Sequence, residues 1–291
     1  MFDKREECPI CGHPKFQNFH ICTDHTVTCE SFALVKCTQC THVFTNPKPT
    51  DEHLAAYYQS AQYISHANAI TSLTDLLYKL VRIYTLRKKR KLIEELAKGQ
   101  EKSLLDFGCG TGHFLHACKK HGWRVTGVEP NSSARKQAQQ GDTPVEESLT
   151  TIKEKYAIIT SWHVLEHTTD PVSVVRELRS KLQDGGHIII ALPNHASYDA
   201  KYYGKYWAGY DVPRHLSHFN RSSFKSLADK TKLKIQDIRP MTFDAFYVSI
   251  LSEKYQRHPG ALLKGLQIGR KSNASAKLTG EYSSLIYLLT K

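Results

Sequence analysis

The sequence predicts an α/β protein: a doubly wound, mostly parallel sheet preceded by a small N-terminal metal-binding module. Two observations predict this architecture. From about residue 102 onward, short apolar runs alternate with helical patterns, which is typical of a parallel sheet covered by helices on both faces. Within the first 46 residues, two Cys-x-x-Cys pairs occur, and this spacing is typical of a four-thiolate metal site.

Length and composition allow one large or two unequal domains, since the chain has 291 residues and 40% hydrophobic content. The formal charge of +12 favours acidic partners such as nucleic acid, nucleotide-linked substrates or acidic membrane surfaces, although a solvated basic surface explains it equally well. No apolar run approaches the ~20 residues of a membrane-spanning helix. The N-terminal MFDKREE is too charged for a secretory signal. We therefore expect a cytoplasmic protein without a membrane partner.

Residues 1–46 are predicted to fold as a zinc-ribbon-like module. Cys8 and Cys11 form one Cys-x-x-Cys pair, and Cys37 and Cys40 form the other. Each such turn directs two thiolates toward one metal ion, so the two pairs together complete a tetrahedral zinc site. Because four thiolates leave no open coordination position, this zinc is expected to be structural. The alternative is that the thiols bind nothing.

Residues 47–99 are predicted to be a linker followed by a long helix. The linker begins with the turn-rich stretch NPKPT. Between residues 71 and 98, apolar residues recur at helical spacing, among them Leu73, Leu76, Leu77, Leu80 and Ile83. The basic run 87–91 lies on this helix and is either a surface for nucleic acid or a solvated helix face, and the pattern favours the second.

Residues 100–291 are predicted to form the α/β domain. Strands are expected at residues 103–107, 123–129, 156–162, 187–192, 232–239 and 283–289. Helices are expected at residues 112–121, 134–140, 171–182 and 220–230, with further helical material at 243–257. In such a sheet, ligands bind at the carboxyl ends of the strands.

The stretch LLDFGCGTG places three alternating glycines, Gly108, Gly110 and Gly112, directly after the first of these strands. No Gly-Lys-Ser/Thr follows, which excludes a phosphate-binding loop, and the G-x-G-x-G spacing departs from that of dinucleotide sites. Asp106 beside the loop would repel pyrophosphate but suits an amine or sulfonium cation. Glu129 ends the next strand, where a carboxylate accepts hydrogen bonds from ribose hydroxyls. A ligand with a ribose, a cation and no phosphate matches S-adenosylmethionine; the alternative is a tight turn without a ligand.

Four motifs in order, LLDFGCGTG, GVEP, SWHVLEH and LQDGGHIIIALPN, resemble those of the class I S-adenosylmethionine-dependent methyltransferases. The resemblance covers about residues 100–291. It implies a Rossmann-like sheet of seven strands, with the last strand antiparallel. It also implies that Asp106, Gly108 and Gly110 line the methionine end of the cofactor and that Glu129 binds its ribose. The full set of cofactor-binding residues that we expect is Asp106, Gly108, Gly110, Gly112, Glu129, Ser161 and His163.

Residues 163–167 read HVLEH, which matches the H-x-x-E-H pattern of some metalloproteases. That pattern functions on a continuous helix, where histidines four residues apart share a face. Here it directly follows a predicted strand, and Asp170-Pro171 begins a new helix three residues later. We therefore set the protease aside. The resemblance implies instead that residues 161–163 face the cofactor or substrate and that His167 ties down the loop.

Residues 194–219 are predicted to form a substrate lid, because loops beyond the carboxyl end of a strand commonly carry function. The segment contains six tyrosines and tryptophans and ends in DVPRHLSHF. This stretch resembles one in methyltransferases of small metabolites, and sugar C-methyltransferases with a zinc module use a histidine in a similar setting. His215 is therefore the candidate catalytic base, with His163 as the second. The alternative is that the aromatic residues pack the lid and that the histidines form local hydrogen bonds.

The lid also departs from the sugar C-methyltransferase pattern. Pro213-Arg214 stands where those enzymes usually have a glutamate before the histidine, so the sugar substrate does not carry over. Arg214 is instead a candidate for pairing with a carboxylate or phosphate of the substrate.

The function predicted from these observations is in-line transfer of a methyl group from S-adenosylmethionine to a small-molecule metabolite. One alternative is an RNA methyltransferase that docks through the zinc module and the basic helix. Another is a protein that binds the cofactor without turnover. The methyl acceptor, the methylated atom and the oligomeric state stay open.

Overall fold

The computed structural model describes residues 2–58 and 73–291, with side chains described for 2–54, 56–58 and 83–291. The chain divides into two compact units. The first comprises Met1–Ile64, His163–Val174 and Ala191–Tyr287, and the second comprises Ser65–Trp162, Val175–Ile190 and Leu288–Lys291. This division groups the N-terminal module with the lid, which the predicted boundaries at residues 46 and 99 keep apart. The predicted start of the long helix, at residues 71–72, lies outside the described residues.

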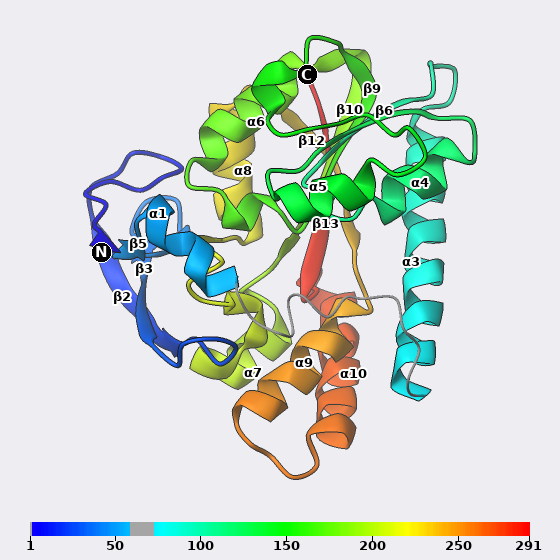
Figure 1. The fold of residues 1–291 in the computed structure, drawn as a ribbon. Coiled ribbons are helices and arrows are strands. Elements are labelled where there is room, and N and C mark those ends of the chain that lie inside the picture. The colour runs from blue at the N-terminus through cyan, green and yellow to red at the C-terminus, as the bar shows by residue number, and fades with distance from the viewer. Residues whose placement is uncertain (1, 59–72) are drawn as a thin grey trace. The chain divides into compact units, whose positions relative to one another are not determined.

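A sheet of seven strands has the order β12-β13-β10-β9-β6-β7-β8 (Figure 1). The pairs β6–β7, β6–β9 and β7–β8 are parallel. The mostly parallel seven-stranded α/β sheet predicted from the sequence is therefore confirmed. Its strands are β6 (Ser103–Phe107), β7 (Arg124–Val128), β8 (Val145–Glu146), β9 (Tyr156–Trp162), β10 (Leu182–Pro193), β12 (Lys234–Pro240) and β13 (Ser284–Thr290).

The central strands of this sheet are apolar on both faces. Leu104 and Leu105 of β6, and Ile158 and Ile159 of β9, are fully buried although they point to alternate sides. The second unit also contains α3 (Leu73–Leu96), α4 (His113–Lys119), α5 (Ser132–Ala138) and the 3-10 helix η2 (Leu149–Thr151). The boundary between the two units falls within α6 (Pro171–Ser180), after Val174. Within the described ranges, no helix combines the length and apolar character needed to cross a membrane.

The first unit contains a second sheet, with the order β11-β4-β3-β2. Three strands come from the N-terminal module: β2 (Phe16–Thr23), β3 (Ser31–Cys37) and β4 (Val43–Thr45). The fourth, β11 (Ser217–His218), comes from the lid and pairs antiparallel with β4. Two further short strands, β1 (Phe2–Asp3) and β5 (Lys48–Pro49), pair with each other and precede α1 (Asp51–Leu54) and η1 (Ala55–Tyr58).

The lid includes three short helices. It contains α7 (Tyr198–Tyr203), η4 (Gly204–Tyr206) and η5 (Ala208–Tyr210). The rest of the first unit contains η3 (Leu165–His167), α8 (Arg221–Lys230), α9 (Asp244–Tyr255) and α10 (Ala261–Thr279). Helix α10, which the sequence analysis does not predict, lies beside α9 (Figure 1). A Cβ at Gly265 of α10 would lie 2.6 Å from Cα of Ile250, so this glycine permits the close approach of the two helices.

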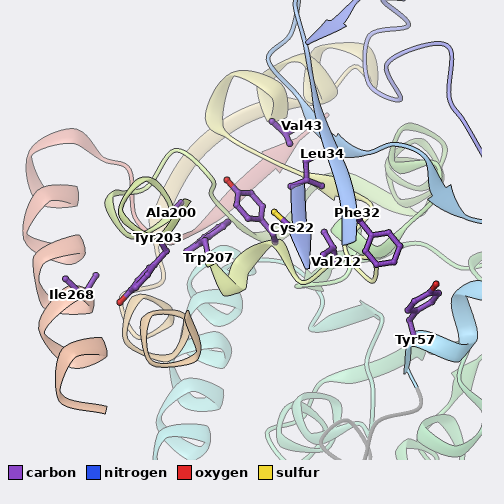
Figure 2. Packing of buried hydrophobic residues seen from close by; sticks show 11 residues of the cluster. Cys22, Phe32, Leu34, Val43, Tyr57, Ala200, Tyr203, Trp207, Val212 and Ile268 are labelled. Carbon is purple, nitrogen blue, oxygen red and sulfur yellow. The ribbon is translucent and has the colours of Figure 1, made fainter. Parts of the chain in front are cut away.

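One apolar core joins the N-terminal strands to the lid (Figure 2). Its members from the N-terminal part are Cys22, Phe32, Leu34, Val43 and Tyr57, and the lid contributes Ala200, Tyr203, Trp207, Tyr210 and Val212. Ile268 of α10 completes it. Three of the six tyrosines and tryptophans of the lid, Tyr203, Trp207 and Tyr210, thus stabilise the fold by burial, as the alternative interpretation of the lid expects.

Candidate functional site

The three positions after β6 require glycine for different structural reasons. All three have positive φ angles, 72° at Gly108, 55° at Gly110 and 79° at Gly112. A Cβ at Gly112 would lie 2.8 Å from Cα of Ala138, so this glycine serves the packing of the loop against α5. A Cβ at Gly110 would meet no atom within 4 Å. Gly110 therefore exposes its backbone to open space, which is what a ligand-binding loop requires.

Glu129 lies at this loop. It follows β7 directly, and its Oε2 accepts a hydrogen bond of 2.9 Å from the backbone N–H of Gly110. Its Oε1 accepts another, also 2.9 Å, from the N–H of Asn131. Two backbone donors thus orient the carboxylate beside Gly110, and the remaining lone pairs are available to hydroxyl donors.

Asp106 is a buried carboxylate at the carboxyl end of β6. Its Oδ1 accepts a hydrogen bond of 2.6 Å from the hydroxyl of Thr160 on β9. Burial raises the pKa of Asp106 to about 6, against the lowering effect of that hydrogen bond. A cation bound nearby would compensate the buried negative charge.

The end of β9 offers two unsatisfied polar atoms. Ser161 pairs with Phe107 in the sheet register, and its hydroxyl is buried without a hydrogen-bond partner among the described residues. The indole Nε1 of Trp162 is in the same situation, while Nζ of Lys89 lies 4.3 Å above the Trp162 ring. Orphaned buried donors are rare in native proteins and point to a missing partner such as a ligand or water.

His163 is held between two carboxylates in the first unit. Its backbone has a φ of 56°. Its Nδ1 lies 3.4 Å from Oε1 of Glu166, and its Nε2 lies 3.1 Å from Oδ2 of Asp244 on α9. Burial alone would lower the pKa of His163, but Asp244 and Glu166 outweigh it and raise the pKa to about 10. His163 therefore lacks the pKa near neutrality that a general base needs.

The HVLEH stretch does not form the helix of a metalloprotease. Only residues Leu165–His167 are helical, as the short 3-10 helix η3. His167 ties down the loop as expected, because its Nδ1 donates a hydrogen bond of 3.1 Å to the carbonyl oxygen of Arg214. Oη of Tyr58 lies 3.0 Å from the same nitrogen.

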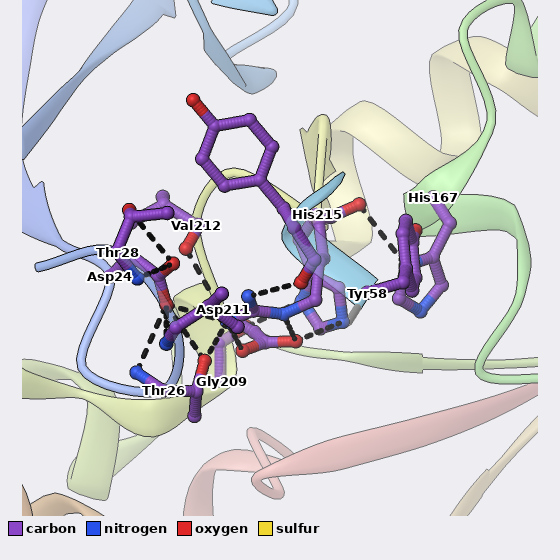
Figure 3. A network of polar contacts seen from close by, with 12 residues as sticks. Asp24, Thr26, Thr28, Tyr58, His167, Gly209, Asp211, Val212 and His215 are labelled. Atoms are coloured by element: carbon purple, nitrogen blue, oxygen red, sulfur yellow. Dashed lines mark hydrogen bonds and ion pairs between the residues drawn. The ribbon is translucent and has the colours of Figure 1, made fainter. Parts of the chain in front are cut away.

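His215 is buried in a polar cluster (Figure 3). Its Nδ1 donates a hydrogen bond of 3.0 Å to the carbonyl oxygen of Gly209, so Nε2 carries the lone pair. Nε2 lies 4.0 Å from Oδ2 of Asp211. One ligand atom each of Glu166, His167 and His215 lies within 4.8 Å of the other two. His215 could be predicted from its motif, whereas the carboxylates of Glu166 and Asp211 beside it could not.

Arg214 does not face a substrate, which corrects the expectation for this residue. It is fully buried, and its guanidinium pairs with Asp211 at 2.6 Å and with Asp24 at 3.0 Å. Burial would raise the pKa of Asp24, but Arg214 and the Asp24–Thr28 turn lower it to about 2. Figure 3 shows Thr26 and Thr28 around Asp24. Because these donors are taken by the protein, Arg214 holds the lid to the N-terminal module.

The four predicted metal-ligating thiols converge. Sγ of Cys8 lies 3.6 Å from Sγ of Cys40, and Cys11 and Cys37 are separated by the same distance. All four sulfurs lie within 4.8 Å of one another. A tetrahedral ion with Zn–S bonds of ~2.3 Å would separate its sulfurs by about 3.8 Å. The thiol group therefore has the dimensions of a tetrathiolate site.

The basic run of α3 is partly used within its own unit. Lys88 lies over the ring of Tyr84 and Lys89 over that of Trp162. Arg90 pairs with Glu94 one turn later. The contacts of Lys88 and Arg90, each with a residue four positions away, are typical of a solvated helix face.

Comparisons with known proteins identify the family. Residues 81–238 match the family model described as "Methyltransferase domain". A ubiquinone biosynthesis O-methyltransferase of Actinobacillus pleuropneumoniae is 32% identical over 108 residues, which cover 32% of this chain and 46% of the relative. The same enzyme of Marinobacter nauticus is 32% identical over 115 residues, covering 35% and 48%. The chain thus spans about half the length of the curated relatives it matches.

Solved structures share the fold. Magnesium protoporphyrin IX methyltransferase from Synechocystis PCC 6803 with bound S-adenosylhomocysteine has a TM-score of 0.54 at 12% identity, covering 82% of this chain and 99% of that one. The O-methyltransferase of a Brevibacillus brevis polyketide synthase, in complex with S-adenosyl-L-homocysteine, has a TM-score of 0.50 at 14% identity, covering 75% of each chain.

The family model matches more than half of the chain, and the strand order and glycine loop agree with it. The resemblance noted from the sequence motifs is thereby confirmed: this chain belongs to the methyltransferase domain family and has its class I, Rossmann-like fold.

Proposed function

We propose that the protein transfers a methyl group from S-adenosylmethionine to a hydroxyl group of a small molecule. The observation that carries this proposal is the open glycine loop, where Gly110 presents bare backbone beside the carboxylate of Glu129, four residues after the buried carboxylate of Asp106. The O-methyltransferase relatives and neighbours support the choice of a hydroxyl acceptor.

The residues of the loop fit this cofactor. S-adenosylmethionine supplies a methyl group that is already activated on a sulfonium. Asp106 attracts the positive charge of the methionine end, and Glu129 accepts hydrogen bonds from the ribose hydroxyls. Gly110 leaves room for the ligand against the backbone, and the unpartnered hydroxyl of Ser161 is an available donor.

Asp106 makes cofactor affinity depend on pH. The ionised carboxylate attracts a cation, whereas the protonated form does not. With a pKa of about 6, only about one tenth of the carboxyl groups is ionised at pH 5. We expect the affinity for S-adenosylmethionine to fall by up to ~tenfold between pH 7.5 and pH 5. Calorimetric titration at pH 5, 6 and 7.5 measures this change.

The matched variant is Asp106→Asn, which should bind more weakly at pH 7.5 and show little dependence on pH over the same range. An equally steep pH dependence in that variant would remove Asp106 from the cofactor site.

His215 is the residue that we assign to activation of the acceptor. Its Nδ1–H is fixed on Gly209, so its Nε2 lone pair is directed to the polar cluster. A hydroxyl needs such a group because its own pKa is far above neutrality. His163, which is protonated between Asp244 and Glu166, acts as a cation that holds the Glu166 carboxylate.

The four-thiol group is proposed to hold one structural zinc ion, with Cys8, Cys11, Cys37 and Cys40 as its ligands. Cys37→Ser should remove one equivalent of zinc per chain, since serine is a poor zinc ligand, and should lower the unfolding temperature. Elemental analysis and thermal unfolding measure both effects. Cys29→Ser, which changes an exposed cysteine outside the group, is the control. Equal zinc content in Cys37→Ser and the control would contradict the assignment.

The proposed reaction is tested with methyl-labelled S-adenosylmethionine and separated fractions of small metabolites and RNA. We expect the label in a small-molecule fraction, on an oxygen atom as identified by mass spectrometry of the product. Label recovered only in RNA would overturn the small-molecule assignment, and no transfer to any fraction would overturn catalysis itself.

A further inference from the structure

Glu166, His167 and His215 form a cluster that methyl transfer by itself does not require. Glu166 and His167 lie on η3, and His215 lies in the lid, so the fold brings together side chains 49 residues apart in the chain. Each offers one ligand atom, and these three atoms lie within 4.8 Å of one another. Two imidazoles and one carboxylate make up the ligand set of many metal sites.

Both histidines are fixed in the tautomer that metal ligands adopt. A carbonyl oxygen only accepts, so the Nδ1 of His215 beside the carbonyl of Gly209 is protonated, and the same holds for Nδ1 of His167 beside the carbonyl of Arg214. In each ring, the lone pair therefore belongs to Nε2. Metal-ligating histidines characteristically donate their other N–H to a backbone carbonyl, which orients the ring.

The Glu166 carboxylate has capacity for a further partner beside His163, and this is the independent sign of a ligand. The residue is 1% exposed, and neither of its oxygens accepts a hydrogen bond from any residue that the structure describes. His163 lies 3.4 Å from Oε1 as an ion pair, but Asp244 shares that imidazole at 3.1 Å. A carboxylate is rarely buried without hydrogen bonds unless it binds a cation.

The surrounding charges favour a cation as well. Asp24 and Asp211 share the single charge of Arg214, so this group of three has one more negative than positive charge. Oδ2 of Asp211 lies 4.0 Å from the Nε2 of His215, on the side of the lone pair.

We propose that a divalent transition-metal ion binds between Glu166, His167 and His215. The three residues leave coordination positions open, in contrast to the four-thiol group. The role of the ion rests on the proposed function. As a Lewis acid, the ion would lower the pKa of the acceptor hydroxyl. His215 would then activate the acceptor through the ion that its lone pair binds. The binding of the ion does not rest on methyl transfer.

Manganese(II) is the probe, because imidazole and carboxylate ligands accept it whereas thiolates favour zinc. The full-length chain is first loaded with one equivalent of zinc to fill the four-thiol group. It is then titrated with Mn²⁺, and free Mn²⁺ is measured by its electron paramagnetic resonance signal. We expect one bound Mn²⁺ per chain in the wild type, and affinity at least ~tenfold weaker in Glu166→Gln and His215→Ala.

Thermal unfolding tests the same site in variants of lower stability, because each variant is compared with and without Mn²⁺. Mn²⁺ should raise the unfolding temperature of the wild type and of the control His258→Ala, a more exposed histidine of the same unit, but not that of Glu166→Gln. No bound Mn²⁺ in the wild type, or equal binding in wild type and both cluster variants, would overturn the inference.

Methyl transfer separates this inference from the proposed function. Transfer that depends on His215 but gives the same rate with and without added Mn²⁺ would overturn the Lewis-acid role of the ion and leave the function standing. Mn²⁺ bound at the cluster in a chain that transfers no methyl group would support the site and overturn the function.

Discussion

Gly110→Val is expected to abolish detectable binding of S-adenosylmethionine, with a loss in affinity of at least ~100-fold, equivalent to about 2.7 kcal/mol. The backbone at Gly110 faces open space, so the valine side chain would fill the volume that the ligand needs rather than clash with the protein. Isothermal titration calorimetry measures the change.

Gly141→Val is the matched control. Gly141 also has a positive φ, 67°, and a Cβ there would also meet no atom within 4 Å. Both variants therefore carry similar backbone strain, of about 1–3 kcal/mol, and similar steric freedom within the protein. Only Gly110→Val should lose the ligand. Unchanged affinity in Gly110→Val would reject this loop as the cofactor site.

His215→Ala is expected to keep the affinity for S-adenosylmethionine and to lose methyl transfer by ~10²–10⁴-fold. The variant removes the Nε2 lone pair from the polar cluster and leaves the cofactor loop in the other unit untouched. It also leaves the carbonyl of Gly209 unpaired, which costs about 1–3 kcal/mol of stability. Turnover with the methyl acceptor and binding of the cofactor are measured side by side.

His20→Ala serves as the control, because His20 is half-buried on β2 of the same unit and lies outside the cluster. It should retain turnover. If His215→Ala turned over as fast as His20→Ala, His215 would leave the list of functional residues, whichever way its lone pair is used.

The central strands could be predicted from the sequence because their signal is local. Residues 103–107 and 156–162 agree with β6 and β9 at both ends, since each is a run of apolar and β-branched residues bounded by polar or glycine-rich segments. The strand predicted at 187–192 begins earlier, at Leu182. Gly185-Gly186 lies within β10, and a Cβ at Gly186 would lie 2.6 Å from the carbonyl oxygen of Ala157.

Elements that depend on tertiary contacts could not be predicted. Helix α10 contains Gly265 and Gly269, which lower helix propensity, and packing against α9 overrides that loss. Strand β11 is two residues long and exists because it extends the sheet at β4, so no periodicity reveals it.

In the candidate site too, residues in local motifs could be predicted, whereas contacts between distant parts of the chain could not. Asp106, Gly110 and Glu129 belong to motifs whose spacing carries their geometry, and Glu129 does lie at the glycine loop. The pairing of Arg214 with Asp24 joins residues 190 positions apart. The sequence does not show that contact, so the arginine of DVPRHL is predicted to bind a substrate. The partners of His163 and His215 could not be predicted for the same reason.

Titration of the wild-type chain with S-adenosylmethionine, and in parallel with NAD, tests most directly whether the loop after β6 is an adenosyl-sulfonium site. We predict one S-adenosylmethionine bound per chain and no heat of binding with NAD, because Asp106 repels a pyrophosphate. Binding of NAD, or no binding of S-adenosylmethionine, would contradict the account.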